Sequence, residues 1–480
     1  MKNRSEEQLN LAVGTDQRAA WMEETRQFAE TFLKGMDDGK AFIAEQPTPG
    51  SLAIDGTPHD LTPLLKIFEK EVVARGLNAA SGGHLGYIPG GGLYASALAD
   101  FLAAVTNEYA GVKFGSPGAV QVEHEVLRWI SRQFGFPESG SAGNLTSGGS
   151  IANLIAITAA RDRHQVLKKG SHRHVVYISE QAHHCILKAF RIVGLGDIIF
   201  RQIALDKGHR MRPDAMREAV ASDLEAGLIP FMVIATAGTT DTGAVDPLDA
   251  MADIAEQYNM WYHIDAAYGG FFIMVDALKP LFKGIDRAQS LVVDPHKGLF
   301  LPYGVGAVLI QDHEAVRMSH HYTPNYLQDM FDEAVPDSPA DLSPELTKHF
   351  RGLRVWLPLQ LHGDQPFIDA LAEKIELTHY FRAEIAKRGF KLGPMPDLSV
   401  SYFWYPAADQ GLGEDDAFNG ELMKAMHADG SVFHSSTTVK GRFVIRVATL
   451  SFRTTRETMD RSLAMIDRCL ARVQRTAKEA

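Results

Sequence analysis

The chain has 480 residues, 45% of them hydrophobic, which is enough for two or three packed units around a sizeable core. Its formal charge of −11 argues against nucleic acid or an anionic membrane as the main partner. The two cysteines, Cys185 and Cys469, exclude a disulfide framework. Because the sequence also shows no apolar leader and no apolar run of membrane-spanning length, we expect a cytoplasmic protein.

The N-terminal part is predicted to be a helical arm. An amphipathic pattern runs from about Asp16 to Met36, and segment 45–60, which contains several Pro and Gly residues, interrupts it. A second helix is expected over LTPLLKIFEKEVVARGL (61–77), with Gly76 ending it. The main packed domain is expected to begin after this helix.

From about residue 144, short strand-like runs alternate with segments of helical spacing. The runs are VVYIS (175–179), FMVIATAG (231–238), WYHID (261–265), SLVVD (290–294) and GAVLI (306–310). Fully apolar strands separated by helices predict an α/β domain with a mainly parallel sheet covered on both faces. Because ligands bind such sheets at the carboxyl ends of the strands, the polar motifs at those ends are the functional candidates.

Residues 318–347 are polar, contain several prolines and are long for a connection, which favours a mobile lid over disordered filler. Beyond about residue 352 the pattern predicts a smaller α+β domain, which ends in the strand-like run RFVIRVATL and a final helix. The predicted division is therefore an arm (1–80), a large domain (81–351) and a small C-terminal domain (352–480).

Two motifs place an acid and an amine at the ends of successive predicted strands. HIDAAYGG (263–270) contains Asp265, and VVDPHKGL (292–299) contains Lys297. A pyridine cofactor that carries an aldehyde needs such a pair, because a buried carboxylate keeps the ring nitrogen protonated and an amine binds the aldehyde. For either motif alone, a salt bridge between a strand-end Asp and a surface Lys is an equally good interpretation.

A small-residue turn opens the helix predicted within NLTSGGSIANLIAITAAR (144–161). The turn consists of Ser147, Gly148, Gly149 and Ser150. Exposed backbone N–H groups and the helix dipole favour an anion such as phosphate there, although an N-cap with a tight glycine turn explains the same residues. The segment lacks G-K-[ST], which argues against a nucleotide triphosphate.

Two further motifs follow predicted strands. His183 stands in ISEQAHHCILKAF (178–190), and Thr240 stands in TAGTTDTGAVDPL (236–248), where it is also a common turn residue. The histidines and the cysteine near His183 are spaced unlike any standard zinc pattern, so no metal site is expected.

Together these motifs resemble those of the group II pyridoxal-phosphate (PLP)-dependent decarboxylases, which include the aromatic-L-amino-acid and glutamate decarboxylases. The resemblance extends from about Gly83 to Arg453. It implies fold type I, the fold of PLP-dependent transferases, and conversion of an L-amino acid to its amine and CO₂. In this family the motif lysine, here Lys297, carries PLP covalently, and the motif aspartate, here Asp265, meets the pyridine nitrogen.

The same resemblance implies roles for the remaining candidates. It places His183, Ala267 and Thr240 beside the ring; the turn Ser147, Gly148, Gly149 and Ser150 with His296 around the phosphate; and Tyr87, Ile88 and Pro89 in the substrate pocket. Tyr326, in TPNYLQD, matches the loop tyrosine that protonates the substrate carbon. That loop reaches the partner's active site in the family, so a homodimer is implied.

The sequence departs from the family at two positions of the lysine motif. Asp294 replaces the usual Asn, and Gly298 replaces a common Trp. An aspartate close to a phosphate is repulsive unless it is protonated or turned away.

The overall pattern, TPNYLQD and RGLRVW above all, resembles bacterial aromatic decarboxylases and favours an aromatic amino acid as substrate. Position 90 is a glycine where aromatic decarboxylases often have Thr, so a substrate with an acidic or another side chain is an alternative. A PLP-dependent carbon–carbon lyase and an aldehyde-forming variant are alternatives within the family. A catalytically silent scaffold would tend to lose Lys297 or Asp265, and both are present.

Overall fold

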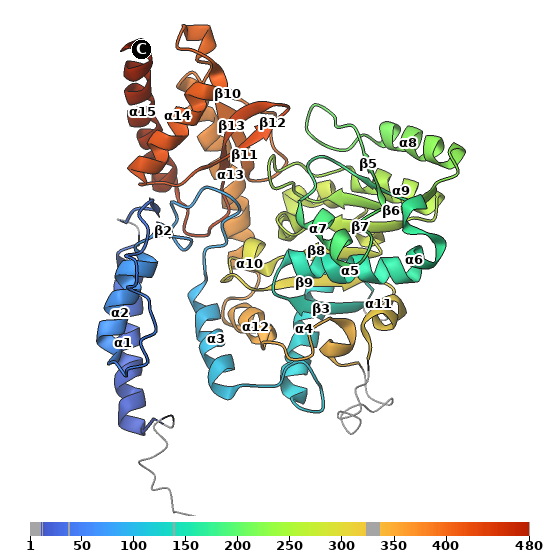
Figure 1. Cartoon of the computed structure of the whole chain (residues 1–480), viewed down its shortest axis with the longest axis horizontal. Helices are drawn as coiled ribbons and strands as arrows, with labels where there is room; N and C mark the ends of the chain where they lie inside the picture. Colours follow the sequence, from blue (N-terminus) through green and yellow to red (C-terminus); the bar gives the residue numbers. More distant parts are fainter. Residues whose placement is uncertain (1–10, 12, 37–38, 138–139, 323–336, 480) are drawn as a thin grey trace, which may run out of the picture.

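A computed structural model describes residue 11 and residues 13–36, 39–137, 140–322 and 337–479 (Figure 1). These residues form an N-terminal helical arm, a large unit around a seven-stranded sheet and a smaller unit around a four-stranded sheet. In the described part of the chain, none of the helices combines the length and apolar character needed to cross a lipid bilayer.

The large sheet has the strand order β3-β9-β8-β7-β6-β4-β5. Its strands are β3 (Ala142–Thr146), β4 (His174–Ile178), β5 (Ile199–Gln202), β6 (Ile229–Thr236), β7 (Trp261–Asp265), β8 (Ser290–Val293) and β9 (Gly306–Ile310). All neighbouring pairs from β5 to β8 are parallel, and β9 is antiparallel to both of its neighbours. The expected mainly parallel sheet is confirmed. β9 is the exception. The twelve residues that join it to β8 (294–305) contain only the four-residue helix α10 (Pro295–Gly298), which is shorter than the helix that usually makes a parallel crossover.

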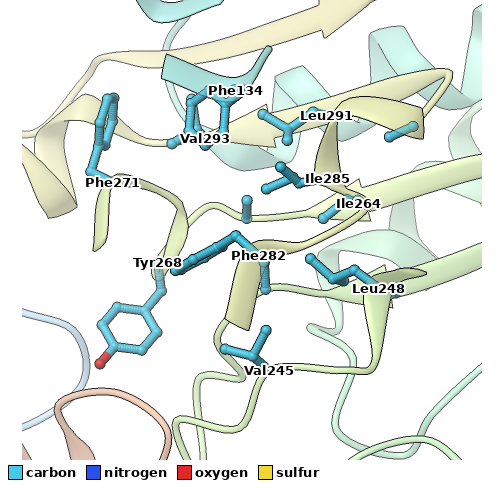
Figure 2. Close-up of a cluster of buried hydrophobic side chains, with 14 of the residues drawn as sticks. Phe134, Val245, Leu248, Ile264, Tyr268, Phe271, Phe282, Ile285, Leu291 and Val293 are labelled. Atoms are coloured by element: carbon cyan, nitrogen blue, oxygen red, sulfur yellow. The ribbon is translucent and has the colours of Figure 1, made fainter. Parts of the chain in front are cut away.

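Helices cover both faces of this sheet because successive strand residues point to opposite sides. On β4, Val175 and Tyr177 belong to one core, and Val176 and Ile178 belong to the other. The first core is covered by α4 (Pro117–Phe134), α8 (Pro213–Glu225) and α9 (Leu248–Gln257), and the second by α5 (Gly149–Arg163), α6 (Val166–Lys169), α7 (Cys185–Ile192) and α11 (His313–His320). Figure 2 shows the first core where Phe134, Ile264 and Leu291 gather.

The smaller unit is an antiparallel sheet with helices, as the expected α+β domain requires. Its strands, in the order β10-β11-β13-β12, are β10 (Lys391–Leu392), β11 (Val400–Trp404), β13 (Arg442–Ala448) and β12 (Ser435–Val439). Its helices are α13 (Gln365–Lys387), α14 (Asp415–Asp429) and α15 (Arg456–Glu479). Helix α12 (Arg351–His362) packs instead on α3 (Tyr94–Thr106) and α4 of the large unit. The division of the chain at residue 352 stays a prediction.

The N-terminal arm pairs α1 (Thr15–Lys34) with α2 (Leu61–Phe68), and Figure 1 shows both helices beside the main body. The second helix is shorter than the predicted 61–77, because it continues only through the π-helical turn Glu69–Val73. Strand β2 (Gly76–Leu77) follows and pairs with β1 (Phe42–Ile43). No residue of α1 is buried in this single chain.

Candidate active site

A cavity of about 340 Å³ lies at the carboxyl ends of β4, β6, β7 and β8, where parallel sheets bind ligands. Its lining includes Ser147, Gly148, Gly149, Ser150, His183, Thr240, Asp265, Ala267, His296 and Lys297. These candidates come from five separate segments of the chain. The fold therefore brings together residues that the sequence places up to 150 positions apart, from Ser147 to Lys297.

Lys297 lies in α10, directly after β8. Its Nζ forms an ion pair with Asp294 Oδ2 at 2.9 Å, one helical turn away. Burial alone would lower the pKa of Lys297, but the attraction and the hydrogen bond of Asp294 outweigh burial and raise it. The amine therefore carries a proton in this arrangement and must lose it before it acts as a nucleophile.

Asp265 is the last residue of β7, and it is buried with only 5% of its surface exposed. Its Oδ1 accepts a hydrogen bond from the backbone N–H of Ala267 at 3.1 Å. Burial raises the pKa of Asp265, and the positive charge of Lys297 partly offsets that effect. A cationic ring nitrogen in the cavity would be a further stabilising partner for this carboxylate.

His183 follows β4 and stands next to the start of α7. The backbone N–H of Cys185 donates to its Nδ1 at 3.3 Å, so that nitrogen carries no proton. Burial also lowers the pKa of His183. The cavity is thus lined by a neutral imidazole, which suits contact with an aromatic ring. Among the described residues, no group of three or more His, Cys, Asp and Glu side chains is arranged to hold a metal ion.

The turn between β3 and α5 fits an anion. Gly148 has φ +152°, a conformation that side chains rarely adopt, and a Cβ at Gly149 would lie 3.1 Å from Asp294 Oδ2 and 3.3 Å from the Ala267 Cβ. Glycine therefore lets the backbone approach the cavity closely. The first N–H groups of α5 receive no capping side chain from the part of the chain that the structure describes. Ile151 and Ala152 already donate to the Gly148 carbonyl, so the N–H groups of Gly149 and Ser150 are the candidates to bind a phosphate.

Sequence reasoning missed several residues of the lining. They are Asn153, Gln181, Cys185, Thr236, Gly238 and Tyr268. Asn153 donates from Nδ2 to the Gly149 carbonyl at 2.9 Å, and its Oδ1 lies 2.8 Å from His263 Nε2. Its place one helical turn after Gly149 is the signal that could have identified it. The other five lie within motifs already singled out at strand ends, namely 178–190, 236–248 and 263–270, and this position is the signal that could have identified them.

The segment Tyr87, Ile88 and Pro89 lies outside the cavity lining of this chain. Tyr87 is exposed, whereas Ile88 is buried in the first core. A Cβ at Gly90, the next residue, would collide with the carbonyl oxygen of His296, so this segment packs behind the lysine helix. The substrate role of Tyr87, Ile88 and Pro89 stays a prediction.

The glycine of the lysine motif also has a packing reason. A Cβ at Gly298 would lie 2.8 Å from the Phe271 Cβ, so this backbone has no room for the Trp that is common in the family.

The predicted lid falls partly outside the described residues, and Tyr326 is among those not described. At its N-terminal end, residues 318–320 form the last turn of α11. At its C-terminal end lies the 3₁₀ helix Pro339–Leu342, where Ser338 and Asp341 form a capping box. The mobility of the lid stays a prediction.

Comparison with known proteins agrees with this geometry. Residues 58–405 match the pyridoxal-dependent decarboxylase conserved domain. An aromatic-L-amino-acid decarboxylase of Bacillus atrophaeus is 33% identical over 378 residues, 78% of each chain. A phenylacetaldehyde synthase of Arabidopsis thaliana is 30% identical over 375 residues, 75% of this chain and 76% of that protein.

The solved structure of Oryza sativa TDC with PLP and tryptamine has the same fold, with a TM-score of 0.89, 23% identity and coverage of 96% of this chain and 99% of that one. The expected fold type I is confirmed. Because the conserved domain spans most of the sequence, the chain belongs to the pyridoxal-dependent decarboxylase family.

Proposed function

We propose that this PLP-dependent decarboxylase acts on aromatic L-amino acids and releases CO₂ and the corresponding amine. The observation that carries the proposal is the meeting of Lys297 and Asp265 in one cavity with a glycine turn suited to a phosphate. The preference for an aromatic side chain rests on the likeness to the Bacillus atrophaeus enzyme and on the motifs TPNYLQD and RGLRVW.

The cavity residues divide into three groups in this proposal. The turn from Ser147 to Ser150, with His296, holds the phosphate. Backbone N–H groups bind it, and the positive end of the α5 helix dipole attracts it. His183, Ala267 and Thr240 contact the ring. Asp265 holds a proton on the ring nitrogen, because its buried carboxylate is most stable beside a cation.

When bound, PLP supplies a protonated pyridine ring that accepts the electron pair left behind by the departing CO₂. Lys297 binds the cofactor and releases the product, and Asp294 Oδ2, 2.9 Å from Nζ, orients the amine. The cavity walls hold the bond between Cα and the carboxylate perpendicular to the ring, which selects this bond for cleavage. Tyr326, outside the described residues, donates the proton to Cα.

The expected homodimer is part of the proposal. Large apolar side chains are exposed both on the arm and on α3. They are Trp21, Met22, Leu64, Ile67, Phe68, Val72, Leu98, Phe101, Leu102 and Val105. A patch of this kind marks a protein interface. In the single chain, α1 has no buried residue, and a second copy of the chain would cover it.

Sedimentation should therefore give twice the chain mass for the wild-type protein. Phe101→Glu, on α3, should weaken association by about tenfold or more, because the interface would bury a charge without a partner. Leu224→Glu, an equally exposed leucine on α8, should leave the dimer intact. Monomers of the wild-type protein, or an equal effect of both substitutions, would contradict the dimer.

We also propose a reducing cytoplasm as the compartment, because both Cys185 and Cys469 are free and buried.

The substrate is tested by incubating the PLP-loaded protein with a panel of aromatic and acidic L-amino acids and identifying products by mass spectrometry. We expect amines lighter than an aromatic substrate by one CO₂. Consumption of acidic amino acids alone would contradict the substrate class and leave the family assignment intact.

The same panel separates a second candidate function. The 30% identity to a phenylacetaldehyde synthase favours an aldehyde-forming reaction as the alternative. Aldehyde in place of amine would establish that alternative. Amine as the main product excludes it.

A further inference from the structure

Asp294, the residue that departs from the family motif, lies buried at the centre of the site. Only 1% of its surface is exposed. Its Oδ2 is 2.9 Å from Lys297 Nζ and 3.7 Å from His296 Nε2. Its Oδ1 has no hydrogen-bond partner among the residues that the structure describes. A buried carboxylate oxygen without a donor is unfavourable, so a proton on this atom, or a donor beside it, would stabilise the site.

The carboxylate of Asp294 also abuts the turn that is suited to a phosphate. A Cβ at Gly149 would lie 3.1 Å from Oδ2, and one at Gly306 would lie 2.6 Å from Oδ1 and 2.7 Å from the backbone of Gly148. The side chain therefore fills the space between the start of α5 and β9. An anion held by the first N–H groups of α5 would come within a few ångströms of this second negative group.

The charges around Asp294 do not balance once a phosphate is present. Among the residues whose positions are described, Lys297 is the one cation in direct contact with Asp294, and it also faces Asp265. His183 and His296 contribute no charge near neutral pH, because burial lowers the pKa of each. Cys185 stays a thiol, since burial raises its pKa to about 12. Adding a phosphate dianion leaves the cavity with an excess of negative charge, which a proton can relieve.

We propose that Asp294 binds the cofactor's phosphate as the neutral carboxylic acid, with Oδ1–H donating a hydrogen bond to a phosphate oxygen. Binding then takes up one proton, which an asparagine at this position would not need because its amide already carries a donor. This inference rests on the proposed function. It gives Asp294 a positioning role for the cofactor and makes loading of the enzyme dependent on pH.

The test uses a ligand that cannot react with Lys297. The dissociation constants of 4′-deoxypyridoxine 5′-phosphate, which lacks the aldehyde, and of 4′-deoxypyridoxine, which also lacks the phosphate, are measured by calorimetry from pH 6 to pH 9. The proteins are the wild type, Asp294→Asn and a matched control, Asp223→Asn. Asp223 is equally buried and pairs with Arg201 outside the cavity lining, so its substitution removes the same charge elsewhere.

We expect Asp294→Asn to bind the phosphorylated ligand at least about tenfold more tightly than the wild type at pH 8.5, because a repulsive charge has been removed. The advantage should shrink as the pH falls, since the wild-type aspartate then gains its proton. Calorimetry in buffers of different ionisation enthalpy should show about one more proton taken up by the wild type than by Asp294→Asn. The ligand without phosphate, and the Asp223→Asn protein, should show no such difference.

Equal or weaker binding by Asp294→Asn at pH 8.5, or the same gain for both ligands, would overturn the role of Asp294. PLP is added in parallel to keep this result apart from the proposed function. If PLP bound to a lysine absorbs in the visible range while the wild type and Asp294→Asn bind the phosphorylated ligand equally well, the result would contradict the Asp294 proposal alone. Absence of that absorption in the wild type would contradict the proposed function as well.

Discussion

Lys297→Ala is expected to lower kcat/KM by about four orders of magnitude or more, because the residue that binds the cofactor and releases the product is lost. No other lysine can replace it among the residues described around the cavity. The two lysines that are buried among the described residues have partners of their own, since Lys348 pairs with Glu123 and Lys374 donates to Glu373 and to the Thr454 carbonyl. Steady-state kinetics with saturating PLP measures the loss.

A control is needed because Lys297→Ala also leaves Asp294 without its counter-ion, which costs about 3 to 5 kcal/mol if the carboxylate stays charged. The double variant Lys297→Ala/Asp294→Asn removes that unpaired charge. It should recover most of the thermal stability and none of the activity. Activity that returns with stability would show that Lys297 serves only the fold.

Asp265→Asn is expected to lower kcat by about a hundredfold to a thousandfold. The asparagine keeps the shape of the side chain and can still accept from the Ala267 N–H, but it carries no charge to hold a proton on the ring nitrogen. The electron pair left by CO₂ is then poorly stabilised. Stopped-flow and steady-state kinetics should show a much larger change in kcat than in PLP affinity.

Asp246→Asn provides the comparison for Asp265→Asn. Burial raises the pKa of Asp246 to about 6, and its carboxylate accepts from the backbone N–H groups of Met211 and Thr236. It lies outside the cavity lining. Its substitution should lower the free energy of unfolding by about 1 to 3 kcal/mol and leave kcat within about threefold. An equal loss of kcat in both variants would mean that Asp265 acts only through the fold.

The strands that position the site could be predicted because nearly all of their residues are apolar and buried. β4, β6, β7, β8 and β9 follow apolar runs within one or two residues of their predicted limits. β3 and β5 could not be predicted in this way. β5 is an edge strand and none of its residues is fully buried, whereas β3 includes Gly143 and a buried Asn144 whose amide pairs with Lys348.

The site could be predicted only in part, for a related reason. Asp265 ends one predicted strand and Lys297 comes three residues after the next, so the topology of a parallel sheet was enough to bring them together. Asp294 was recognisable as a departure from the family motif, but its contact with Gly149 and Gly306 depends on how α5 and β9 pack. Tyr268 likewise depends on tertiary packing, since its hydroxyl is held by Ser399 of the smaller unit.

The central claim is that PLP bound to Lys297 in this cavity performs the chemistry. Its most direct test is reduction of the PLP-loaded protein with borohydride, followed by digestion and peptide mapping by mass spectrometry. We predict about one pyridoxyl phosphate group per chain, attached to the peptide that contains Lys297. No other lysine should be modified in stoichiometric amount. Stoichiometric modification of a different lysine, or none at all in a protein that turns over amino acids, would contradict this account of the site.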